Sequence, residues 1–89
     1  MRAIITVVGC DKVGIIYEVS KVLAENGVNI LDISQTIMQD MFTMIMLVSI
    51  DKEKVHVSEL SSVLDGVGKK IGVSIKIQHE DLFNSMHRI

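Results

Sequence analysis

The sequence predicts a single α+β domain in which one antiparallel sheet of four strands carries two helices on one face. The hydrophobic pattern switches between a period of two and a period of about 3.6, in the order strand, helix, strand, strand, helix, strand. Two of the four strand segments are apolar on both faces, and the other two on one face only. The length, 89 residues, suits one compact domain with a modest core.

The first strand and the first helix follow from the N-terminal residues. Residues 3–9, "AIITVVG", are apolar on both alternating faces, and Gly9 ends the strand. Asp11 is a suitable N-cap, because its carboxylate can accept hydrogen bonds from the free amides of a first helical turn. The helical period that follows ends at Gly27, a typical left-handed C-cap residue. The apolar face of this helix comprises Ile15, Val19, Val22 and Leu23.

A hairpin comes next. Residues 29–38, "NILDISQTIM", alternate between apolar and polar, which is typical of a strand with one wet face. The residues "QDM" connect it to 42–50, "FTMIMLVSI", which is largely apolar on both faces. Four of the chain's six methionines lie here, either to fill the core or, alternatively, to form a pliable docking surface for a partner. They are Met38, Met41, Met44 and Met46.

The last third predicts a helix, a strand and a short tail. Apolar spacing predicts a helix over 55–71, which Gly66 and Gly68 weaken by up to about 1 kcal/mol each relative to alanine. Residues 73–79, "VSIKIQH", alternate cleanly and predict the fourth strand. The tail, about 80–88, reads as a short C-terminal helix with acidic residues at its start and basic residues at its end. Its apolar side comprises Leu82, Phe83 and Met86.

This order is the split βαβ arrangement of ferredoxin-like domains, and the burial pattern fits the sheet order 4-1-3-2. Right-handed crossovers place both helices on the same face of the sheet. The opposite face would then expose apolar residues such as Ile45 and Leu47, and a surface of that kind usually marks an interface. We expect the C-terminal helix or a second copy to cover it. We also expect a homodimer, paired edge to edge or face to face.

Composition narrows the functional classes. A net charge of −2 gives no sign of a nucleic-acid binder. Cys10 is the only cysteine, so an internal disulfide is excluded and a reducing compartment fits. No apolar run approaches the roughly 18 residues of a membrane helix, and the start lacks the features of a signal peptide. We therefore expect one cytoplasmic domain over 1–89, without a cofactor, a nucleic-acid partner or a membrane partner.

The run "VVGCDKVGII" followed by "LAENGVNILDIS" resembles the start of an ACT domain, a small regulatory module that binds amino acids. The resemblance covers nearly all of the chain. It is nearest to small stand-alone ACT proteins of bacteria and archaea, of uncharacterised role, whose ends look like "IQHEDLFNSMHRI", and these resemble the ACT modules of a glycine-cleavage repressor. The matching residues are Gly9, Asp11, Lys12, Gly14, Ile15, Gly27, Val28, Asn29 and Ile30.

The resemblance implies a non-catalytic, allosteric sensor that holds a small amino acid at a dimer interface. Asp11 would bind the ligand's ammonium group, and the backbone amides from Lys12 to Ile15 would meet its carboxylate at a helix N-terminus. Asn29 would hydrogen-bond across the interface. Two positions depart from amino-acid-binding ACT loops, which often carry a proline at Val13 and in some cases a polar residue at Gly9. The implied ligand-binding residues are Gly9, Cys10, Asp11, Lys12, Val13, Gly14, Ile15, Asn29 and Ile30.

A purely structural interpretation stands beside this one. Asp11 can be only an N-cap, Gly14 a requirement of helix–sheet packing, and Asn29 a turn residue. We favour binding because we expect these residues to converge at one end of the sheet. A third hypothesis is a protein-interaction module without a small ligand, acting on a metabolic enzyme or a transcriptional regulator through the methionine-rich sheet face or the C-terminal helix.

Other activities on this topology need residues that the chain lacks. A heavy-metal-binding domain needs C-x-x-C in the first loop, where Val13 stands in place of the second cysteine. An acylphosphatase needs a loop arginine, and the only arginines are Arg2 and Arg88. An RNA-recognition domain needs an aromatic-basic motif on the central strands, and Tyr17, Phe42 and Phe83 do not form one. The loop does not match a P-loop either.

Catalytic and metal-binding residues are not expected either. Cys10 has no histidine near it in sequence to act as a base, so a small thiol without a nucleophilic role is the better interpretation. The histidines, which are His56, His79 and His87, lack metal-ligand spacing, and surface or capping roles suit them better. An enzyme is the least favoured class.

Overall fold

The computed structural model describes residues 1–10, 12–51 and 53–81. Its elements follow the predicted order, with bounds within two residues of the predicted ones. They are β1 (Arg2–Gly9), α1 (Lys12–Glu25), β2 (Asn29–Met38), β3 (Met41–Ser49), α2 (Val57–Ile71) and β4 (Ser74–His79). Of the predicted C-terminal helix, only Glu80 and Asp81 are described, and both are helical; the remainder of that prediction, 82–88, lies outside the described residues.

The sheet has the order β2-β3-β1-β4 with antiparallel neighbours, which confirms the predicted ferredoxin-like topology. At one end, Arg2 pairs with Ser49, and Ser49 pairs with Asn29. At the other end, Gly9 pairs with Phe42, and Phe42 pairs with Ile37. We call these the Arg2 end and the Gly9 end. Strands β1 and β2 therefore run parallel, each from the Arg2 end to the Gly9 end.

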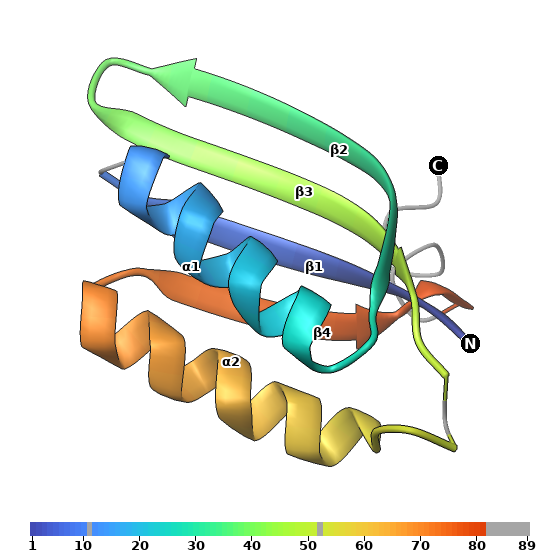
Figure 1. Cartoon of the computed structure of the whole chain (residues 1–89). Helices are drawn as coiled ribbons and strands as arrows, with labels where there is room; N and C mark the ends of the chain where they lie inside the picture. The colour runs from blue at the N-terminus through green and yellow to red at the C-terminus, as the bar shows by residue number, and fades with distance from the viewer. Residues whose placement is uncertain (11, 52, 82–89) are drawn as a thin grey trace.

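Both helices lie on the same face of the sheet, as predicted from the handedness of the crossovers (Figure 1). The core forms between this face and the helices. From the two central strands it takes alternate residues, namely Ala3, Ile5 and Val7 of β1 and Phe42, Met44, Met46 and Val48 of β3. Met44 and Met46 are fully buried, which confirms core filling for these two methionines. We call the opposite face of the sheet the open face.

The end of α1 has the capping geometry that the sequence predicts. Gly27 has a φ of 68°, in the left-handed region that favours glycine. Its amide donates to the carbonyl of Ala24 and the amide of Val28 donates to that of Leu23, the two bonds of a Schellman motif. The Asn26 side chain also donates to the carbonyl of Val22, at 2.8 Å.

Helix α2 packs directly beside β4, and one glycine makes this possible. A Cβ added at Gly68 would lie 2.7 Å from the carbonyl oxygen of Val73, whereas one added at Gly66 would meet open space. The prediction that both glycines simply weaken the helix is therefore incomplete. Gly68 permits close approach of helix and strand, and Gly66 has no such role.

Strand β2 is the less protected edge of the sheet. All ten of its residues are exposed, including the isoleucines that face the helix layer. The register shifts between Ile30 and Asp32, so that Leu31 forms a bulge. In Figure 1, β2 and α2 lie at opposite margins of the molecule. The predicted edge position of this strand is confirmed, but the predicted burial of one of its sides is not, because all ten residues are exposed.

Candidate ligand site and pairing surface

Gly9, the first residue of the candidate loop, is buried at the end of β1. A Cβ at this position would lie 2.3 Å from Cγ1 of Val73 and 2.9 Å from Cδ1 of Ile15. Side chains thus occupy the space where a larger residue would sit. Packing alone accounts for glycine here, and the predicted contact of Gly9 with a ligand stays a prediction.

The rest of the loop leads into the first turn of α1. Cys10 is a free, exposed cysteine. Asp11, predicted as an N-cap and ligand residue, lies outside the described residues, and the helix begins at Lys12. Val13 is exposed, Gly14 is half-buried and Ile15 belongs to the core. From Ile15 only the backbone can therefore serve a ligand, which is the role that the resemblance implies for it.

Asn29 and Ile30 do not lie beside this loop in the same chain. Both are exposed at the Arg2 end of the sheet, whereas the loop is at the Gly9 end. Seven residue steps of about 3.3 Å separate the ends by roughly 23 Å. The expected convergence at one end is therefore wrong within one chain. The reason is that the 14-residue α1 returns the chain along the whole sheet before β2 begins.

Exposed large apolar side chains are concentrated on one margin of the domain. Of the ten among the described residues, nine belong to α1, β2 and β3, and Val63 of α2 is the exception. Sequence analysis missed Val13 and Tyr17, although both fall outside the core-facing positions of α1. We call the following residues of α1 and the β2–β3 hairpin the edge patch: Val13, Tyr17, Ile30, Leu31, Ile33, Ile37, Met38 and Met41.

The methionines do not form a single surface. Met44 and Met46 are in the core, whereas Met38 and Met41 pair with each other at the exposed turn of the hairpin. The hypothesis of a methionine-rich sheet face is therefore wrong. The reason is that alternation along β3 turns the two central methionines toward the helices.

Two depressions occur away from the candidate loop. A groove of about 400 Å³ between α2 and β4 is lined mainly by polar residues and contains none of the predicted site residues. A hollow of about 110 Å³ lies near the open face, with Ile4, Asp32, Ile33, Ser34, Ile45 and Leu47 along it.

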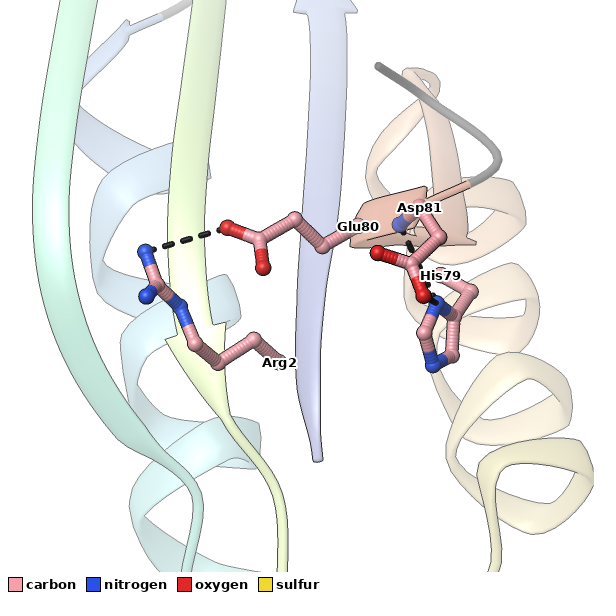
Figure 2. A network of polar contacts seen from close by, with 4 residues as sticks. All are labelled: Arg2, His79, Glu80 and Asp81. Atoms are coloured by element: carbon pink, nitrogen blue, oxygen red, sulfur yellow. Dashed lines mark hydrogen bonds and ion pairs between the residues drawn. The ribbon is translucent and has the colours of Figure 1, made fainter. Parts of the chain in front are cut away.

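A small network of polar contacts lies at the Arg2 end of the sheet. Arg2 Nη2 lies 3.0 Å from Glu80 Oε2, and the Asp81 amide donates to His79 Nδ1 at 3.1 Å (Figure 2). His79 thus has the capping role predicted for it, while His87 lies outside the described residues. His56 occupies the N-cap position of α2 without a side-chain hydrogen bond to cap the helix.

The described residues also bear on metal binding and on membrane insertion. The part of the chain given above shows no cluster of three or more His, Cys, Asp or Glu side chains that could hold a metal ion. Within the same part, no helix is long and apolar enough to cross a membrane.

Comparison with known proteins identifies the family. The sequence model of the ACT domain matches residues 2–78. The chain belongs to the ACT domain family. A UPF0237 protein of Clostridium acetobutylicum is 61% identical over 89 residues, which is 100% of both chains. This ACT domain therefore spans the whole length of that relative.

Solved structures agree with the assignment. An ACT domain protein from Streptococcus pneumoniae superimposes with a TM-score of 0.81 at 46% identity, over 93% of each chain. A proposed glycine cleavage system transcriptional repressor gives a TM-score of 0.75 at 26% identity, over 86% of this chain and 44% of that one. Both the predicted family and the predicted likeness to glycine-cleavage repressor modules are confirmed.

Proposed function

We propose that this ACT domain is a non-catalytic sensor that forms a homodimer through β2 and binds a small amino acid between the two protomers. The observation that carries the proposal is the edge patch. An exposed edge strand that carries large apolar side chains is an aggregation hazard unless it is paired or covered. Pairing with a second copy removes the hazard and buries the apolar side chains of both protomers.

The register of the sheet explains how such a dimer would complete a site. A two-fold axis perpendicular to the sheet pairs β2 with the partner's β2 in antiparallel fashion. The start of the partner's strand, with the partner's Asn29, then lies beside Ile37. Because Ile37, Phe42 and Gly9 form one row across the sheet, the partner's Asn29 reaches the Gly9 end. Residues that lie at opposite ends of the sheet in one chain thereby come to the same end in the dimer, three strand spacings or roughly 14 Å apart.

The chemistry of the loop suits a zwitterion. Asp11 supplies a negative charge for an ammonium group, and the first amides of α1 supply hydrogen-bond donors and partial positive charge for a carboxylate. The partner's Asn29 can both donate and accept a hydrogen bond. A free amino acid carries both charged groups, and a small one fits best because Val13 and the partner's Ile30 add apolar bulk.

Titration calorimetry of the full chain against each of the twenty amino acids tests the ligand. We expect one or a few small amino acids to bind, at one or two equivalents per dimer. Asp11→Ala should abolish the binding heat while lowering the free energy of unfolding by about 1 kcal/mol, the cost of a lost cap. Asp65→Ala is the matched control, because Asp65 pairs with Lys69 on α2, away from the loop, and its loss should leave binding unchanged.

If the chain forms a dimer that binds none of the twenty amino acids, the ligand is removed from the proposal. The function that then stays is that of a protein-interaction module without a small ligand. Capture of one protein from extract by the wild-type chain but not by an edge-patch variant, with and without amino acids, would then support that second function.

A further inference from the structure

The open face of the sheet carries a second apolar surface, separate from the edge patch. Strand alternation places Ile4, Ile45 and Leu47 on this face, in neighbouring rows of β1 and β3. Ile45 is exposed and Leu47 half-buried, whereas Ile4 is buried at the bottom of the surface. Ile4 and Leu47 pair directly, and the hollow of about 110 Å³ adjoins them. Asp32, which pairs with Leu47, adds a carboxylate at its margin. The surface is thus a small apolar depression with one acidic edge.

The end of β4 directs the chain onto this face. Arg2 follows the alternation of β1 and lies on the open face, opposite the core residue Ala3. Figure 2 shows the Glu80 side chain crossing β1 to reach Arg2, with both helices behind the sheet. The Glu80 side chain is only 25% exposed, so the ion pair is partly sheltered.

We propose that residues 82–89 of the same chain fold back over the open face and fill this hollow. Four of these eight residues are apolar, namely Leu82, Phe83, Met86 and Ile89. The basic residues His87 and Arg88 complement Asp32 at the margin. The hollow lies about two strand spacings from β4, roughly 10 Å, and eight residues span about 12 Å even as a helix.

The ion pair favours this occupant over a second copy of the chain. The ion pair with Arg2 holds Glu80, two residues before the tail, on the open face. The tail therefore meets the hollow at a high effective concentration. Once the tail covers the open face, the edge patch is the large apolar surface left for association. The tail thus selects edge-to-edge pairing and disfavours face-to-face pairing of the sheets.

Disulfide trapping in the full chain tests the proposal. In a Cys10→Ser background, Ser34→Cys in the hollow is combined with Ser85→Cys in the tail. Mild oxidation should give an intramolecular disulfide, seen as a 2 Da mass loss without a covalent dimer. The matched control combines Ser85→Cys with Ser62→Cys, which lies in the groove between α2 and β4 on the other side of the molecule.

Two results would overturn the proposal. Equal intramolecular yields for the two pairs would mean that the tail has no preferred site. A covalent dimer formed by Ser34→Cys alone would mean that a second copy occupies the open face. As an independent measurement, Phe83→Asp should raise the fluorescence of a bound hydrophobic dye several-fold with unchanged circular dichroism, and an unchanged dye signal would contradict the proposal.

Discussion

The two edge strands of the sheet, β4 and β2, differ in how far the rest of the chain covers them. Strand β4 is short, at six residues, and its Ile75 is buried under the neighbouring α2. Strand β2 is ten residues long, and none of its residues is buried. An exposed strand edge invites pairing with another chain. The comparison indicates that α2 shelters β4 within the chain, whereas β2 stays exposed, which is the condition that the proposed dimer requires.

The difference arises from where the helices come closest to the sheet. Gly68 lets α2 approach the backbone at Val73, so that the helix shelters β4. The side of α1 facing the core covers mainly the central strands, through Ile15, Val19 and Leu23. The isoleucines of β2 that face the helix layer, Ile33 and Ile37, remain 39% and 53% exposed.

Of the substitutions that test this difference between the edges, a charge on β2 should have the largest effect, which is on dimer association. In the proposed dimer, Ile37→Glu would bury a carboxylate without a partner, which costs several kcal/mol. We expect the dimer dissociation constant to rise by about a hundredfold or more, equivalent to about 2.7 kcal/mol. Sedimentation velocity over a concentration series measures it.

Val63→Glu provides the matched control for Ile37→Glu. Val63 is also an exposed apolar residue, at 42%, but it lies on α2 away from the edge patch. Its substitution should leave the dissociation constant unchanged. Equal weakening by both variants would show that the edge patch has no special role in association.

The two glycines of α2 test how closely this helix covers β4. Gly68→Ala places a methyl group against the Val73 carbonyl and should lower the free energy of unfolding by about 1–3 kcal/mol. Gly66→Ala meets open space in a helix interior and should raise it by about 0.5–1 kcal/mol. Urea unfolding of both variants measures the difference, and effects of the same sign would contradict the close approach of α2 to β4.

Much of the fold was predictable because local patterns determine it. The two-sided apolar strands β1 and β3 indicated the centre of the sheet, and Gly27 indicated the end of α1. The bulge at Leu31 and the need for Gly68 were not predictable, because the bulge depends on the pairing with β3 and Gly68 on how the chain turns back from α2 into β4, at Val73 and Ile75. Periodicity alone cannot separate a tolerated glycine from one that a neighbouring strand requires.

The candidate site was predictable only in part, for a topological reason. The motif "GCDKVG" correctly indicated a strand-to-helix loop. The motif "NGVNI" correctly indicated the start of the next strand. Because β1 and β2 run parallel, one chain holds these motifs at opposite ends of the sheet. Bringing them together requires a symmetry operation, and no pattern within one chain contains that information.

The central claim is that the partner's β2 brings Asn29 to the loop after β1. The native Cys10 is exposed in that loop and permits a direct test with Asn29→Cys. A bismaleimide linker too short to span the sheet should convert this variant to a covalent dimer that carries two linkers. The wild-type chain and a Ser62→Cys variant should stay monomeric on denaturing gels. Failure of Asn29→Cys to cross-link, or cross-linking of all three proteins to the same extent, would contradict the account.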